Sequence, residues 1–277
     1  MRLATIRTEG ATRAARVDGE SATLLPFADV GEVLASGEDW NSRAAVDGET
    51  VALSSVELAP VVPRPEKIVC VGLNYRAHAA EANLDLPEYP ILFAKYWRSL
   101  IGPADDLVLP GNSDKVDWEA ELGLVIGGPV RHADSEAART AIAGYTVVND
   151  ISMRDWQRRT SQFLQGKTFE RSTPAGPFLV TPDELDDPGR LHMTCTVDDE
   201  VMQDAFTDDL VFSPIEIVSY VSGIITLAPG DLIATGTPGG VGGARRPSIF
   251  LKAGQTVRTK IDGVGELVNR CVAEPAS

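Results

Sequence analysis

Every second residue between positions 116 and 126 is apolar, and the intervening positions carry Asp117, Glu119 and Glu121. Because the side chains of a strand point alternately to its two faces, this pattern predicts a half-buried strand with both glutamates on its polar face. Like charges two residues apart repel each other, and a divalent cation held by oxygen ligands offsets that repulsion. The pattern alone leaves two interpretations, a metal site and an ordinary surface strand.

The rest of the pattern predicts a chain rich in strands, with few long helices. Short apolar runs predict strands at 3–8, 12–17, 22–26, 67–72, 145–149, 178–181, 192–197 and 232–235. The runs 255–261 and 265–272 predict a hairpin across Asp262-Gly263. Helices are expected at 29–36, 135–143, 154–164 and 213–224, the last with Ser213 as its cap and Pro214 as its first residue. This mixture favours an α+β, mainly β fold over a doubly wound sheet.

A proline-rich connector divides the chain into two predicted domains. Residues 1–62 are expected to form a small N-terminal α/β domain, and residues 63–277 a larger catalytic one. The sequence Val-Pro-Arg-Pro at 62–65 reads as a stiff link, because each proline fixes its own φ and restricts the residue before it.

Composition narrows the range of partners. The net charge of −15 over 277 residues argues against nucleic acid and anionic membranes as partners. No apolar run approaches the length of a membrane span, and the first residues lack the apolar core of a signal peptide. Cys70, Cys195 and Cys271 are scattered, which is typical of reduced thiols that pack as small apolar residues. We therefore expect a cytoplasmic protein; the charge says little about the substrate, because an acidic surface can surround a locally cationic pocket.

A third carboxylate, Asp150, follows the apolar run 145–149 directly. Side chains at the end of a strand often serve function, although a helix cap for the residues from Ser152 onward is the alternative. Together with Glu119 and Glu121, Asp150 would form an all-oxygen site that suits Mg²⁺ or Mn²⁺. No cluster of histidines and cysteines favours zinc.

His78 and Glu81 are three residues apart and would share one face of a helix. A carboxylate on one imidazole nitrogen raises the basicity of the other, which can then deprotonate water. From the spacing alone, an ordinary surface pair is the more common explanation. His132 and His192 have no such partner in the sequence and are interpreted as structural.

Two lysines and a glycine-rich loop are further candidates. Lys95 lies among apolar residues and Lys167 follows Gly166; each side chain either extends into solvent or faces a pocket. The loop 235–243 follows a strand, so its backbone N–H groups can bind a carboxylate or phosphate. It matches neither the phosphate-binding P-loop nor the dinucleotide fingerprint.

Six segments, in the same order along the chain, resemble the fumarylacetoacetate hydrolase family between residues 67 and 273. They are 71–75 with His78 and Glu81; 93–95 with Ser99 and Leu100; 117–122; 149–152 with Arg154, Asp155 and Gln157; 166–169 through 174–177; and 230–231 through 236–238. The likeness is to the branch of acylpyruvate hydrolases and 2-hydroxyhepta-2,4-diene-1,7-dioate isomerases. Tyr96, Glu170 and the stretch 171–173 depart from the common pattern and leave the substrate open.

The resemblance implies a β-sandwich roll with a small N-terminal domain, assembled as a homodimer. It implies that Mg²⁺ or Mn²⁺ is held by Glu119, Glu121 and Asp150. It also implies a water-activating pair, His78 and Glu81, and a lysine beside the metal, Lys167. The positions that match substrate contacts are Tyr75, Lys95, Arg154, Gln157 and Thr237.

The resulting expectation is a metal-dependent hydrolase that cleaves a C–C bond of acylpyruvates such as fumarylpyruvate, in the catabolism of aromatic compounds. The alternatives are an isomerase or decarboxylase acting on hydroxymuconate-type diacids or oxaloacetate through the same enolate, and a non-catalytic member of the family. The intact set of candidate residues argues against a non-catalytic protein.

Overall fold

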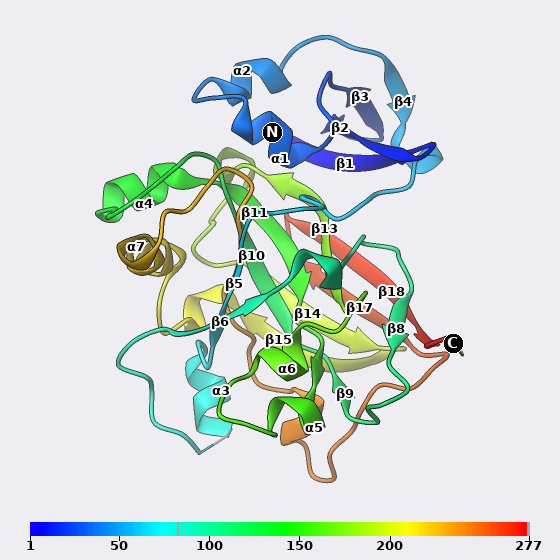
Figure 1. Cartoon of the computed structure of the whole chain (residues 1–277), viewed down its shortest axis with the longest axis vertical. Helices are drawn as coiled ribbons and strands as arrows, with labels where there is room; N and C mark the ends of the chain where they lie inside the picture. Colours follow the sequence, from blue (N-terminus) through cyan, green and yellow to red (C-terminus); the bar gives the residue numbers. More distant parts are fainter. Residues whose placement is uncertain (82, 276–277) are drawn as a thin grey trace.

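The computed structural model describes residues 1–81 and 83–275 and is organised around one long mixed sheet (Figure 1). The sheet has the order β4-β3-β2-β1-β13-β11-β10-β16-β5-β6, with β7 pairing beside β13. Its strands are β1 (Arg2–Thr8), β2 (Ala11–Asp18), β3 (Ser21–Leu24), β4 (Thr50–Ala52), β5 (Ile68–Gly72), β6 (Ile91–Lys95), β7 (Leu100–Ile101), β10 (Ala120–Ile126), β11 (Ile142–Asn149), β13 (Thr173–Val180) and β16 (Leu232–Ala234).

A second sheet, of order β15-β14-β17-β18-β8, packs against β10, β11 and β13. It contains β8 (Leu107–Leu109), β14 (His192–Val197), β15 (Glu200–Phe206), β17 (Thr256–Ile261) and β18 (Gly265–Ala273). Buried apolar side chains of both sheets, such as Leu122, Val147 and Met193, belong to one core cluster. A short pair, β9 (Val116–Asp117) and β12 (Ser152–Met153), lies apart from both sheets. The predicted mainly β sandwich is confirmed, and so is the hairpin of β17 and β18.

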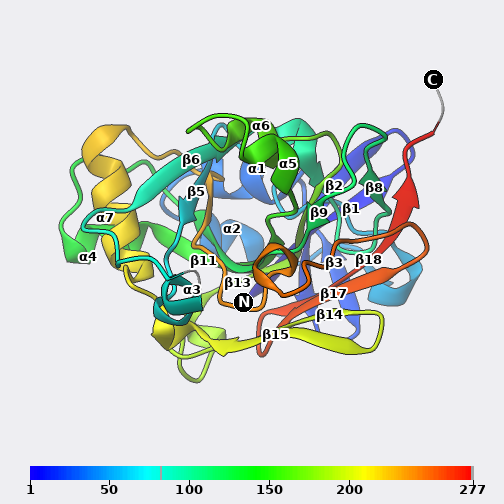
Figure 2. The same ribbon diagram turned by 90° about the horizontal axis from the view of Figure 1, so that it is seen from below.

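Helices are short and lie around the sheets. They are α1 (Val30–Ala35), α2 (Trp40–Ala44), α3 (Arg76–Glu81), α4 (Ser135–Ala141), α5 (Arg154–Gln157), α6 (Leu164–Lys167) and α7 (Pro214–Ile224). Figure 2 shows α4 and α7 together at one side of the molecule, where they contact each other. The Ser213 side chain accepts a hydrogen bond from the Glu216 N–H, and Glu216 binds the Ser213 N–H, so α7 begins as predicted. No helix within the described residues is long and apolar enough to cross a membrane.

The N-terminal strands extend the same sheet as the larger part of the chain. β1 pairs with β2 on one side and with β13 on the other, where Leu3 lies opposite Leu179. Arg7 donates to both carboxylate oxygens of Asp105, at 2.8 and 2.5 Å. These contacts join the two parts, and the domain boundary at residue 62 stays a prediction.

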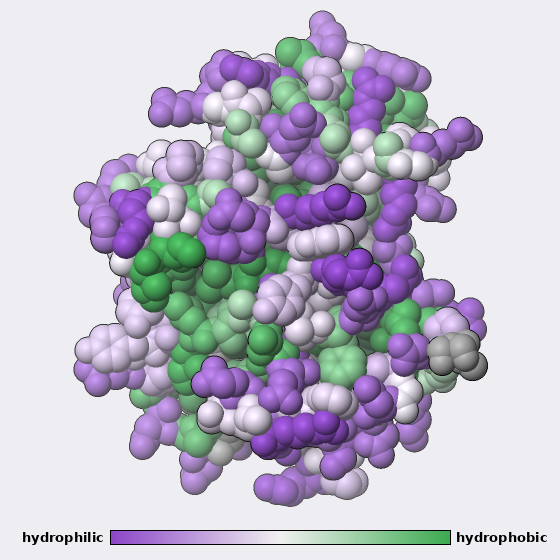
Figure 3. Space-filling model, in the orientation of Figure 1, coloured by the Kyte–Doolittle hydropathy of each residue, from purple (hydrophilic) through white to green (hydrophobic). Residues whose placement is uncertain are grey.

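An apolar area is visible on the face shown in Figure 3. Exposed large apolar side chains include Tyr220, Ile224 and Ile225 of α7 and the residue that follows it, and Tyr89. The rings of Tyr89 and Tyr220 have centroids 6.4 Å apart. The expected homodimer stays a prediction.

The acidic strand differs from its prediction in two ways. Residues 118 and 119 interrupt it, so that β9 and β10 are separate strands. The polar face is also buried, because Asp117, Glu119 and Glu121 expose at most 6% of their surface. β10 lies between β11 and β16 in the centre of the sheet, which no residue within the strand indicates.

The helix predicted at 154–164 is also wrong. The chain forms the two single-turn helices α5 and α6, which contact each other. A side-chain carbon at Gly166 would lie 2.5 Å from the backbone nitrogen of Gln157. Because only glycine allows this close approach, α6 folds back onto α5 and brings Lys167 towards Arg154.

Gly144 of β11 makes a similarly close approach, since an added Cβ would lie 2.3 Å from the carbonyl oxygen of Val180. We predict that Gly144→Ala lowers the free energy of unfolding by about 1–3 kcal/mol, because the strands must separate. The matched control is Gly223→Ala in α7, where the added carbon meets nothing within 4 Å. Urea unfolding should show a gain of about 0.5–1 kcal/mol for this control. Equal stability of Gly144→Ala and the wild type would contradict the packing described here.

Candidate active site

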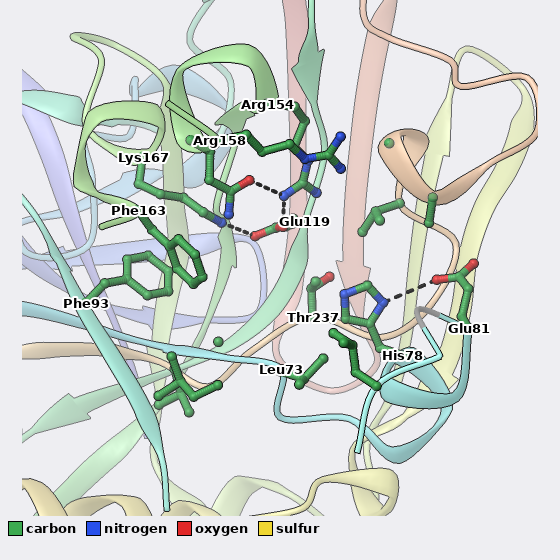
Figure 4. A pocket seen from close by; sticks show the side chains of 18 of the residues that line it. Leu73, His78, Glu81, Phe93, Glu119, Arg154, Arg158, Phe163, Lys167 and Thr237 are labelled. Atoms are coloured by element: carbon green, nitrogen blue, oxygen red, sulfur yellow. Dashed lines mark hydrogen bonds and ion pairs between the residues drawn. The ribbon is translucent and has the colours of Figure 1, made fainter. Parts of the chain in front are cut away.

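A cavity of about 630 Å³ opens between α3, β6, the α5–α6 segment and the loop that follows β16 (Figure 4). Glu119 and Lys167 lie at its floor, and His78 and Glu81 lie on the opposite side. Glu121 also lines the cavity. Phe93 and Phe163, in edge-to-face contact with ring centroids 5.8 Å apart, form part of an apolar wall. The cavity therefore combines an acidic floor with an apolar side and a histidine.

Strand register brings the three predicted metal ligands together. Ala120 of β10 lies opposite Asn149 of β11, which places Glu119 next to Asp150. The Asp150 N–H donates to the Glu119 carbonyl at 2.8 Å, and the Glu119 N–H donates to the Asn149 side chain at 2.9 Å. One carboxylate oxygen each from Glu119, Glu121 and Asp150 lies within 4.8 Å of the others. The buried triad can hold a divalent cation.

Basic side chains neutralise two of these carboxylates. Lys95 reaches Asp150 at 2.6 Å, Arg154 reaches Glu119 at 2.6 Å, and Lys167 contacts both Asp150, at 2.8 Å, and Glu119. Burial by itself would raise the pKa of Glu119, but Arg154 and Lys167 outweigh it and lower the pKa to about 2. Burial would likewise lower the pKa of Lys167, and the carboxylates of Asp150 and Glu119 outweigh it and raise that pKa.

Glu121 is the exception in this cluster. Among the described residues it has no basic partner, and its side chain accepts one hydrogen bond, from the Gly236 N–H at 2.8 Å. Burial, and then the neighbouring charges of Asp150 and Glu119, raise the pKa of Glu121 well above its ordinary value.

The charges within the cluster do not balance. Four buried carboxylates, Asp117, Glu119, Glu121 and Asp150, face three buried cations, Lys95, Arg154 and Lys167. Four negative charges against three positive ones leave one negative charge when all are ionised. A buried set of oxygen donors with excess negative charge fits a hard divalent cation.

Asp117 joins two parts of the site, a role that the sequence patterns did not single out. Its carboxylate accepts hydrogen bonds from Arg154 Nε at 2.7 Å and from the N–H groups of Gly242 and Gly243 at 2.7 and 2.8 Å. It therefore fixes Arg154 and the glycine-rich loop at the same time. The signal was present, because Asp117 has the same parity as Glu119 and Glu121 in the alternating segment.

The five expected substrate contacts separate into two groups. Arg154, Gln157 and Thr237 line the cavity, and Arg154 Nη1 donates to Gln157 at 2.9 Å. Lys95 and Tyr75 do not line the cavity; Lys95 pairs with Asp150, and the Tyr75 hydroxyl is buried with no hydrogen-bond partner among the residues that the structure describes. Burial raises the pKa of Tyr75. Lys95 is joined to the site by its ion pair with Asp150.

His78 and Glu81 form the predicted pair on α3. His78 Nδ1 lies 3.2 Å from a carboxylate oxygen of Glu81, and both side chains line the cavity. The Gly240 N–H donates to Glu81 at 3.1 Å, which ties α3 to the glycine-rich loop. The loop thus binds a carboxylate, as its composition indicated, although the carboxylate belongs to the protein.

The chain matches the family described as fumarylacetoacetate (FAA) hydrolase C-terminal over residues 67–272, and it belongs to this family. It is 46% identical over 255 residues to "Oxaloacetate tautomerase FAHD2A, mitochondrial" of Bos taurus, covering 90% of this chain and 80% of that protein. These findings confirm the resemblance drawn from the motifs.

Two solved structures define the branch. The 2-hydroxyhepta-2,4-diene-1,7-dioate isomerase of Mycobacterium marinum is 31% identical, with a TM-score of 0.82 and 100% of both chains covered. The maleylpyruvate hydrolase of Sphingobium sp. SYK-6 is 30% identical, with a TM-score of 0.82 and coverage of 99% of this chain and 100% of that one. The chain is thus similar to enzymes of three reaction types, a tautomerase, an isomerase and a hydrolase.

Two glutamine substitutions distinguish the loss of metal binding from the loss of the surrounding ion pairs. We predict that excess Mg²⁺ or Mn²⁺, at about 100 times its Kd, stabilises the wild type by about 3 kcal/mol in thermal melts. Glu119→Gln and Glu121→Gln should both abolish this gain. Without metal, Glu119→Gln should cost about 3 kcal/mol because Arg154 and Lys167 lose a charged partner. Glu121→Gln should leave the metal-free stability unchanged or raise it, because a buried carboxylate without a basic partner becomes a neutral amide. A metal-induced stabilisation that persists in Glu121→Gln would contradict the assignment of Glu121 as a metal ligand.

Proposed function

We propose that this protein is a divalent-metal-dependent enzyme that forms the enolate of a 2-oxo acid, and that keto–enol tautomerisation of an oxaloacetate-type acid is its main reaction. The observation that carries the proposal is the buried carboxylate triad, of which Glu119 and Glu121 line the cavity beside Lys167, while Asp150 lies beneath them in contact with Lys167. The similarity to an oxaloacetate tautomerase, at 46% identity, supports the choice of reaction.

Glu119, Glu121 and Asp150 would hold Mg²⁺ or Mn²⁺. When bound there, the ion would supply a Lewis acid for the 2-oxo and carboxylate oxygens of a substrate. Oxygen donors of this kind suit both ions.

Lys167 and Arg154 supply fixed positive charge to the substrate. Lys167 is held against Asp150 and Glu119, and its ammonium group donates hydrogen bonds to the developing enolate oxygen; it is not assigned as the proton acceptor. Arg154 has a buried Nη2 group with no hydrogen-bond partner among the described residues, and Arg154 lines the cavity. A substrate carboxylate would satisfy this donor.

Proton transfer is assigned to His78. Tautomerisation removes one proton from C3 of the acid and adds one to its 2-oxo oxygen, so no atom is gained or lost. His78 takes the C3 proton while Glu81 holds the imidazole in position, and the imidazolium then gives the proton to the enolate oxygen, which yields the enol. Gly240 keeps Glu81 in place for this role.

Hydrolysis of acylpyruvates is the second candidate, and the His78–Glu81 pair favours it. The same base can deprotonate water, which attacks the distal carbonyl; the C–C bond then breaks to give a free acid and the enolate of pyruvate. Similarity to a maleylpyruvate hydrolase supports this reaction. Similarity to a diacid isomerase supports enolate chemistry in general.

The proposal predicts metal-dependent turnover of enol oxaloacetate. Protein stripped of metal with EDTA should accelerate the loss of enol absorbance only after Mg²⁺ or Mn²⁺ is restored. Lys167→Met should lower kcat by about 100- to 1,000-fold because the enolate loses a preorganised charge. Release of pyruvate from maleylpyruvate at a higher kcat/KM would shift the assignment to the hydrolase. No turnover of either substrate by metal-loaded protein would refute both.

Replacing His78 tests the proton transfer separately from metal binding. We predict that His78→Asn lowers kcat by about 100- to 10,000-fold while the metal-induced rise in Tm remains. His132→Asn is the matched control, because His132 is an exposed histidine outside the cavity whose positive φ asparagine also tolerates. Full activity of His78→Asn would show that another group moves the proton.

A further inference from the structure

Two arginines at the mouth of the cavity, Arg158 and Arg246, have no role in the chemistry described above. Both line the cavity and both are exposed. Neither forms an ion pair with any residue that the structure describes. Figure 4 places Arg158 on the same side of the cavity as Arg154, across from His78.

The neighbouring arginines in the sequence behave differently. Arg159 stacks on the ring of Trp156, with its guanidinium carbon 3.4 Å from the ring centroid. Arg245 donates hydrogen bonds to the carbonyl oxygens of Met202, at 2.8 Å, and Gly240, at 3.3 Å. In each Arg-Arg pair one side chain is held by the protein and the other faces the cavity.

The other basic residues that line the described cavity are already paired, unlike Arg158 and Arg246. Arg154 and Lys167 at the floor are already paired with buried carboxylates. The acidic residue opposite them, Glu81, is bound to His78 and to the Gly240 N–H. The positive charge of Arg158 and Arg246 is therefore not neutralised from within the described cavity wall, although the whole chain carries a net charge of −15.

We propose that Arg158 and Arg246 determine specificity by binding the second carboxylate of a dicarboxylic 2-oxo acid. This inference rests on the proposed function, in which the first carboxylate and the 2-oxo group lie at the floor. A guanidinium matches a carboxylate with two parallel hydrogen bonds, and two of them at the mouth also attract a dianion to an otherwise acidic protein.

The size of the cavity extends the substrate class. A volume of about 630 Å³ lies in the range of sites that hold much larger ligands than a four-carbon acid. Diacids longer than oxaloacetate therefore belong to the same substrate class. Monocarboxylic 2-oxo acids are selected against because they lack the second carboxylate that the two arginines bind.

The test compares two substrates that differ only in the second carboxylate, oxaloacetate and its 4-methyl ester, on the metal-loaded enzyme. For Arg158→Gln/Arg246→Gln we expect KM for oxaloacetate to rise by about 10- to 100-fold, with kcat nearly unchanged, because charge-assisted hydrogen bonds are lost. Kinetics with the ester should stay as in the wild type. Arg159→Gln makes a matched change in charge one residue away and should alter neither substrate. The variant Arg158→Lys/Arg246→Gln should bind oxaloacetate more tightly than the double glutamine variant. Lysine keeps the positive charge but cannot donate the two parallel hydrogen bonds of a guanidinium.

Equal losses on both substrates, or no loss on oxaloacetate, would overturn the proposal. If the wild type turns over no 2-oxo acid, the proposed function fails, and calorimetry decides the inference separately. Binding of 2-oxoglutarate should then exceed binding of its 5-methyl ester, and the double variant should remove that difference. A wild type with no preference for 2-oxoglutarate would also overturn the role of these arginines.

Discussion

The excess of negative charge beneath the cavity is the constraint on which the rest of the site depends. Ionised groups are costly to bury unless they are paired, and this cluster places four buried carboxylates beside three buried cations. Lys95, Arg154 and Lys167 each lie against carboxylates that would otherwise be unpaired. Glu121 has no such partner among the described residues, and burial beside two other carboxylates raises its pKa because its ionised form is unfavourable there. A cation bound by this cluster would neutralise the excess charge, which would link the stability of the fold to its chemistry.

The fold brings these charges together from distant parts of the chain. Antiparallel pairing of β10 with β11 places Glu119 beside Asp150. The fold-back at Gly166 directs Lys167 to both of them, and Asp117 anchors Arg154 and the glycine-rich loop together. The same loop holds Glu81 through Gly240 and so positions His78. One connected set of polar contacts therefore links the acidic floor to the histidine on the opposite side of the cavity.

Features with a local cause could be predicted from the sequence. The capping box at Ser213, the hairpin across Asp262-Gly263 and the acidic triad follow from residues close in sequence or from ordered family motifs. Features that depend on distant neighbours could not. The interruption of the strand at Glu119 and the burial of both its faces arise from the central place of β10 in the sheet. The β-strand Thr173–Val180 contains two prolines and a glycine, so only its final residues were predicted. Arg158 and Arg246 have no distinguishing local pattern, because their neighbours Arg159 and Arg245 are the same residue type.

A crystal structure grown with Mn²⁺ would test the central claim most directly. An anomalous difference map should show one strong peak in contact with carboxylate oxygens of Glu119, Glu121 and Asp150, with Glu121 among the ligands. Neutralisation of Glu121 by the ion is the feature that distinguishes a metal site from a cluster of structural ion pairs. A map without a peak there, with Glu121 still bound only to the Gly236 N–H, would contradict the claim that the cluster is a cation site.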